Sequence, residues 1–150
     1  MDNEELIEIA KKARENAYAP YSNFKVGAAL LTRSENVYKG CNVENASYGL
    51  TVCAERVAIF NAVSNGEKEF IKMAIVKGSN KENEKEISEE NIQEIEKKDM
   101  QESEDFLTPC GACMQVMSEF NPDLELILLD TTGKIITISL KELFPKPFQL

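Results

Sequence analysis

Residues 52–66 read VCAERVAIFNAVSNG, and this stretch decides the predicted fold. Its apolar residues recur at helical spacing from Val52 to Val63, and the pair Asn65-Gly66 is typical of a helix end. Segments that favour strands precede and follow it. The stretch therefore predicts a helix inserted between strands of one sheet.

The remaining elements follow outward from this helix. We predict strands at 24–31, 37–43, 70–76, 124–129 and 135–138, and further helices at 6–17, 109–120 and 140–144. Turn residues between the first two strands favour a hairpin. Strands that alternate with helices predict a three-layer α/β/α domain over residues 1–150, with a central mixed sheet of five strands and helices on both faces.

The acidity of the chain is concentrated in one segment. Residues 79–105 contain eleven acidic side chains and four lysines, so they account for most of the net charge of -9. The segment has no aromatic residue and is predicted to be a solvated insertion, within which Ile87, Ile92 and Ile95 could support a short helix. A polynucleotide substrate is disfavoured, because binding to phosphate backbones requires an excess of basic groups.

Other features limit the location and the chemistry. The N-terminal residues lack the parts of a signal peptide, and no apolar run approaches the roughly 20 residues that cross a bilayer, so we expect a cytoplasmic protein without membrane contact. The four cysteines favour metal ligands or buried thiols over disulfides in that reducing compartment. The chain has no histidine, so a metal must be bound by thiolates and carboxylates.

Two segments place cysteine at predicted helix N-termini: Cys53, and Cys110 with Cys113. Unpaired backbone N–H groups and the positive end of a helix favour the thiolate, which is the form that binds metal. Cys110 and Cys113 lie on one helical face and can bind one ion. With Cys53 as the third ligand, a fourth position stays open for water, as in catalytic zinc sites. Glu55 would lie near that water without binding the metal.

Six segments occur in the order of a known family: AYAPYS at 17–22, FKVGAAL at 24–30, GCNVENASYG at 40–49, CAER at 53–56, PCGAC at 109–113 and LFP at 143–145. On these segments the chain resembles the small homotetrameric cytidine deaminases. The resemblance covers roughly residues 4–78 and 107–148. It implies a Zn²⁺-dependent hydrolase that converts free cytidine and deoxycytidine to uridine and deoxyuridine plus ammonia, in pyrimidine salvage.

The resemblance also implies roles for individual residues. Glu55 moves the protons between water, N3 and the departing ammonia, and Arg56 donates to the ligand thiolates. The implied substrate contacts are Asn42 and Glu44 with the ribose hydroxyls, Phe24 and Ala54 beside the substrate, and Phe148 from a neighbouring subunit against the base. Met114 departs from the family, in which many members carry a second arginine after the last cysteine.

Several alternatives stay open. Cys110 and Cys113 could be a redox pair or buried thiols, Glu55 an ordinary acid in a first helical turn, and Arg56 a surface cation. Cys41 is interpreted as a small buried apolar residue rather than a ligand. The rival functions are a deaminase of another aminopyrimidine nucleoside such as blasticidin S, a polynucleotide editor, and a zinc module without catalysis.

Overall fold

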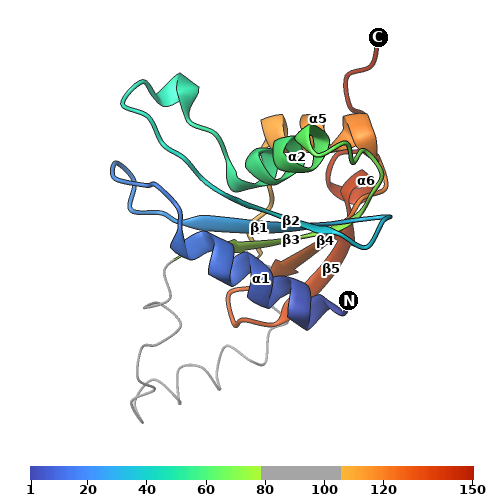
Figure 1. Cartoon of the computed structure of the whole chain (residues 1–150), viewed down its shortest axis with the longest axis horizontal. Helices are drawn as coiled ribbons and strands as arrows, with labels where there is room; N and C mark the ends of the chain where they lie inside the picture. Colours follow the sequence, from blue (N-terminus) through green and yellow to red (C-terminus); the bar gives the residue numbers. More distant parts are fainter. Residues whose placement is uncertain (79–105) are drawn as a thin grey trace.

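The computed structural model describes residues 1–78 and 106–150 (Figure 1). The insertion predicted at 79–105, with its short helix, lies outside the described residues. The described strands are β1 (Val26–Thr32), β2 (Val37–Cys41), β3 (Phe70–Lys77), β4 (Glu125–Leu129) and β5 (Ile135–Ser139). The described helices are α1 (Asn3–Glu15), the 3-10 turn η1 (Tyr48–Leu50), α2 (Ala54–Ser64), α5 (Gly111–Phe120) and α6 (Leu140–Leu143).

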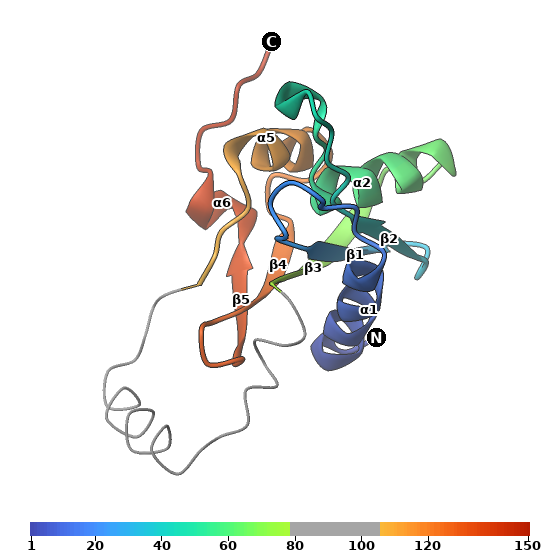
Figure 2. The same ribbon diagram turned by 90° about the vertical axis from the view of Figure 1, so that its left-hand side faces the viewer.

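The five strands form one mixed sheet in the order β2-β1-β3-β4-β5. Strands β3 and β4 are parallel, and every other neighbouring pair is antiparallel. Helix α1 covers one face, and α2, α5 and α6 lie on the other (Figures 1 and 2). The predicted three-layer α/β/α arrangement around a mixed five-stranded sheet is therefore confirmed.

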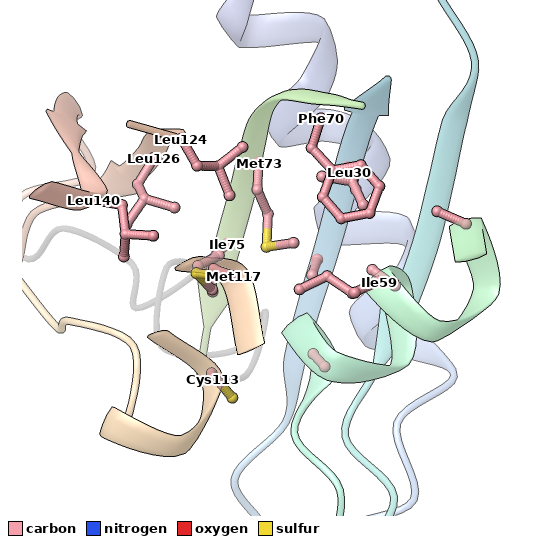
Figure 3. Close-up of a cluster of buried hydrophobic side chains, with 14 of the residues drawn as sticks. Leu30, Ile59, Phe70, Met73, Ile75, Cys113, Met117, Leu124, Leu126 and Leu140 are labelled. Atoms are coloured by element: carbon pink, nitrogen blue, oxygen red, sulfur yellow. The ribbon is translucent and has the colours of Figure 1, made fainter. Parts of the chain in front are cut away.

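Strand β1 is buried at every position because it is covered on both faces. Its residues alternate between two apolar clusters. Ala28 and Leu30 belong to the cluster under α2 and α5, whereas Ala29 and Leu31 pack in the cluster under α1. Cys113 belongs to the first cluster and lies at its border (Figure 3), so one predicted metal ligand is fixed by the core itself.

Helix α2 packs directly against β2. A Cβ atom at Gly40 would lie 2.2 Å from the carbonyl oxygen of Ala54 and 2.4 Å from the amide nitrogen of Ala58, so only glycine permits this approach. The contact fixes the first turn of α2 close above the sheet. Cys53, the N-cap residue of α2, is positioned by this contact.

The predicted hairpin strands are longer than those observed. Strand β1 begins two residues after Phe24, and β2 ends just before Asn42. The Asn42 amide still donates to the carbonyl oxygen of Val26 at 3.3 Å, but the return bond goes to the Asn42 side chain. Its Oδ1 accepts from the amide of Val26 and its Nδ2 donates to the carbonyl oxygen of Phe24, both at 2.8 Å. The ladder therefore gives way to side-chain hydrogen bonds at this end of the hairpin.

Helix α1 begins three residues before the predicted helix at 6–17 and ends two residues before its predicted end. It begins with a capping box between Asp2 and Glu5, and it ends at Glu15. The Ala17 amide donates to the carbonyl of Arg14 at 3.0 Å, three residues earlier, so the last turn is tighter than an α-helix. None of the helices in the described ranges is long and apolar enough to cross a membrane.

Candidate active site

Three cysteine side chains from distant segments meet at the N-termini of α2 and α5. Cys53 and Cys110 are the N-cap residues of these helices, and Cys113 lies in the first turn of α5. The Sγ atoms of Cys53 and Cys110 are 3.9 Å apart, those of Cys110 and Cys113 are 3.4 Å apart, and all three lie within 4.8 Å of one another. The predicted convergence of the three sulfurs is therefore present in the structure.

This geometry fits a zinc ion. Four ligands at 2.3 Å in a tetrahedron place two sulfurs about 3.8 Å apart, close to the spacing of these cysteines. All the cysteines are free thiols, and the fourth, Cys41, is outside the group on β2. Three thiolates fill three tetrahedral positions and leave one for water or substrate, so the donor set suits a catalytic site.

Hydrogen bonds to its sulfur favour the thiolate of Cys53, which is the form that binds metal. The pKa of Cys53 falls to about 5, because its sulfur accepts hydrogen bonds from the Cys113 thiol and from Arg56. Nη2 of Arg56 lies 3.5 Å from Sγ of Cys53. Nε of Arg56 is buried without a hydrogen-bond partner in the described part of the chain. A cation held in this way is suited to a cluster that carries three negative charges.

Glu55 lies in the first turn of α2, and its side chain is buried among the same groups. Burial raises its pKa, and a hydrogen bond with Cys113 partly opposes this shift. A carboxyl group with a raised pKa exchanges protons more readily near neutral pH than an exposed one does. The carboxyl group therefore lies beside the sulfurs, and its role in moving protons stays a prediction.

A short backbone pairing joins the predicted sugar-binding residues to the metal site. Val43 and Val52 exchange two backbone hydrogen bonds of 3.0 Å, so the segment with Asn42 and Glu44 lies beside the residue that precedes Cys53. The Glu44 carboxylate accepts from the hydroxyl of Ser22 at 2.5 Å and from two backbone amides. These bonds, the Ser22 hydroxyl first, lower the pKa of Glu44 and keep it ionised.

The two predicted aromatic contacts lie in different places. Phe24 precedes β1 and is 42% exposed, whereas Phe148 lies after α6 on the C-terminal segment and is 72% exposed. The side chain of Gln115 holds the backbone of Phe148 with two hydrogen bonds of 3.0 Å. Among the described residues no ring contact joins Phe148 to Phe24. Ala54, fully buried, lies between Cys53 and Glu55.

Two residues that organise the site escaped the sequence analysis. Ser22 binds Glu44 and also accepts from the amide of Phe24, and Gln115 fixes the backbone of Phe148. Gln115 is a polar residue within the apolar run MQVM of α5, which is the one sequence signal that could have indicated it. Ser22 ends the segment AYAPYS at 17–22, but its bond to Glu44 could not be predicted because the two residues are distant in sequence.

Comparisons with known proteins agree with this geometry. A family model described as the cytidine and deoxycytidylate deaminase zinc-binding region matches residues 1–128. A cytidine deaminase of Sporosarcina psychrophila is 40% identical, over 99% of this chain and 92% of its own length. The crystal structure of a cytidine deaminase from Burkholderia pseudomallei has 44% identity and a TM-score of 0.78, covering 99% of this chain and all of its own. A blasticidin-S deaminase of Bacillus cereus is 29% identical, over 94% of this chain and 88% of its own length.

Replacement of Cys53 by alanine should abolish stoichiometric zinc binding, because two thiolates remain where three converge. Zinc content per chain, measured by plasma mass spectrometry after gel filtration, checks this. Cys41→Ala is the matched control and should keep full zinc content. Equal zinc in both variants would remove Cys53 from the ligand set.

Proposed function

Because this chain belongs to the cytidine and deoxycytidylate deaminase family, we propose that it hydrolyses free cytidine and deoxycytidine to uridine and deoxyuridine, with release of ammonia. The observation that carries this proposal is the meeting of three cysteine sulfurs within 4.8 Å beside the buried carboxyl group of Glu55. Hydrolysis of this C–N bond needs an activated water and a group that moves protons, and this arrangement offers both.

Cys53, Cys110 and Cys113 would hold the zinc ion. The bound ion supplies Lewis-acid chemistry that lowers the pKa of water at its open position. Arg56 has the complementary task of offsetting the excess negative charge of three thiolates through its hydrogen bond to Cys53. It is the cation on which we expect the tuning of the site to depend, since Met114 brings no charge.

We assign the proton transfers to Glu55. Its carboxylate takes a proton from the attacking water as the new C4–O bond forms, and it delivers that proton to N3 of the base. It then carries the hydroxyl proton of the intermediate to the amino nitrogen, so that the C4–N bond breaks and ammonia leaves. Burial suits this exchange, because it raises the pKa of Glu55 toward the working range.

Asn42 and Glu44 are the proposed contacts with the sugar. The Asn42 amide uses one donor on Phe24 and one acceptor position on Val26, so a second donor and a second lone pair remain. The Glu44 carboxylate offers about four acceptor positions, of which three are occupied. Both side chains are held in place by hydrogen bonds to the protein and keep unused donor or acceptor positions. Such groups are suited to bind sugar hydroxyls.

The base would lie between these residues and the sulfurs. Ala54 is the first residue of α2, where backbone N–H groups have no partner within the helix, and we assign it a contact with the base. Phe24 would form an apolar wall. Ala54 and Phe24 could also contact another aminopyrimidine nucleoside such as blasticidin S. Asn42 and Glu44, however, favour a ribose or deoxyribose sugar. The acidic net charge speaks against a polynucleotide.

We place this reaction in pyrimidine salvage in the cytoplasm, where a reducing environment keeps three thiols available for metal. We also propose a homotetramer in which Phe148 of one chain completes the site of a neighbour. The exposure of Phe148 and the two hydrogen bonds between Gln115 and its backbone support this, because the side chain is open to solvent on a backbone that is held in place.

Light scattering should give a mass about four times the 16.8 kDa of one chain.

Phe148→Ala should raise KM for cytidine about tenfold while kcat changes less, because the lost contact is with the bound base. Phe60→Ala, at another exposed phenylalanine, is the control. A monomer with full activity would contradict the shared site.

We propose that residues 79–105 are an insertion in a single domain over 1–150. Replacement of the insertion by a short Gly-Ser linker should leave kcat for cytidine within about twofold of that of the full chain, because none of the proposed site residues lies in it. Circular dichroism establishes that the shortened chain is folded. Loss of turnover in a folded, zinc-loaded protein would mean that the insertion shapes the site.

Glu55→Gln tests the reaction itself. Zinc content should stay unchanged, while kcat should fall by at least the 10²- to 10⁴-fold typical of a lost acid–base group. The readout is the decrease in ultraviolet absorbance as cytidine becomes uridine. Glu67→Gln, a carboxylate remote from the site that is hydrogen-bonded to Ser34 and Asn36, should keep wild-type turnover. Turnover by Glu55→Gln near the wild-type rate would refute the assignment.

A further inference from the structure

One lysine connects the end of a central strand to the turn that carries two zinc ligands. Nζ of Lys77, the last residue of β3, donates a hydrogen bond of 2.7 Å to the carbonyl oxygen of Thr108. Thr108 lies two residues before Cys110, at which α5 is capped. The partners are 31 residues apart in sequence, with 79–105 between them.

The backbone of Lys77 is fixed independently of this bond. Lys77 pairs with Val26 in the β1–β3 ladder, and its carbonyl oxygen accepts from Nη1 of Arg14 on α1 at 3.4 Å. The next amide, of Gly78, donates to the carbonyl of Lys25 at 2.9 Å. The lysine is therefore a fixed point of the sheet from which an ammonium group reaches Thr108.

The turn that receives the bond has little regular structure of its own. Phe106 forms an isolated bridge with Asp130, and α5 begins only at Gly111. Between them Leu107 and Thr108 are exposed, whereas Pro109 is buried, so the weakly held part of this turn is the pair Leu107 and Thr108. A bond from an ammonium group to a carbonyl is charge-assisted and stronger than a neutral one, so it can restrain such a segment.

We propose that Lys77 is a positioning residue for the metal centre: by holding the carbonyl of Thr108 it fixes the approach to Cys110 and Cys113 and isolates these ligands from residues 79–105. The inference rests on the zinc site of the proposed function. Its physical basis is that closing a long segment costs entropy, and that cost is borne at the first fixed contact on each side. After this segment the Phe106–Asp130 bridge is the first such contact, and the Lys77–Thr108 bond adds a second one between it and the cysteines.

The positive charge of Lys77 lies close enough to Glu55 to affect its protonation. It lowers the pKa of Glu55, against the larger effect of burial. This proximity offers a second explanation for any effect of Lys77, namely a direct influence of its charge. The test must therefore separate the hydrogen bond to Thr108 from the charge alone.

The experiment measures the rate at which zinc passes from the loaded full-length protein to a chromogenic chelator. Lys77→Met removes the donor and keeps most of the stem, and it should release zinc on the order of tenfold faster. Lys77→Arg keeps a donor and should restore most of the retention. Lys72→Met is the matched control on β3, where Nζ binds the carbonyl of Met1 and the side chain of Asn3, and it should match wild type.

The same substitutions in the chain shortened at 79–105 separate the two explanations. If Lys77 isolates the ligands from this segment, Lys77→Met should have little effect once the segment is removed. The shortened chain with Lys77→Met should then release zinc at nearly the same rate as the shortened chain that keeps Lys77. Acceleration by the same factor in both chains would overturn the isolating role, because Lys77 would then act in the same way without the segment. A wild-type release rate for Lys77→Met in the full chain would overturn the proposal altogether. A wild-type protein that binds no zinc would instead overturn the proposed function.

Discussion

The meeting of two helix N-termini above the sheet is the constraint on which the rest of the structure depends. Cys53 caps α2 and Cys110 caps α5, so the positive ends of both helices point toward one cluster of sulfurs. Like-charged thiolates repel, and the helix ends, Arg56 and a divalent ion together offset that repulsion. The glycine at position 40 lets α2 approach the sheet, and the core fixes Cys113.

The parts of this arrangement that depend on local sequence could be predicted. Helical spacing identified α2 and α5, and cysteine at the start of each helix indicated the metal site, because capping geometry is set by a few adjacent residues. The length and patterning of the strands gave the layers of the fold. The boundaries were less accurate: the hairpin ends early because the amide of Val26 bonds the Asn42 side chain in place of the Asn42 carbonyl oxygen.

The contacts that organise the site around these elements could not be predicted in the same way. Ser22 with Glu44, Gln115 with Phe148 and Lys77 with Thr108 are hydrogen bonds between residues 22 to 33 positions apart. No periodicity encodes such pairs, since they exist only after the sheet has brought distant segments together. They are also the contacts that hold the proposed substrate residues and the turn before the last two cysteines.

The wide separation of the three cysteines has a consequence for how the protein is made. Cys53 and Cys110 are 57 residues apart. At about 5–20 residues per second, the ribosome adds the last sulfur roughly 3 to 12 seconds after the first. The core cluster that contains Cys113 also includes Leu126 and Leu128 of β4, which follows α5 in the chain. Zinc binding is therefore a late event in the synthesis of the chain. A chain whose synthesis ends before this point has cysteine thiols but no complete zinc site.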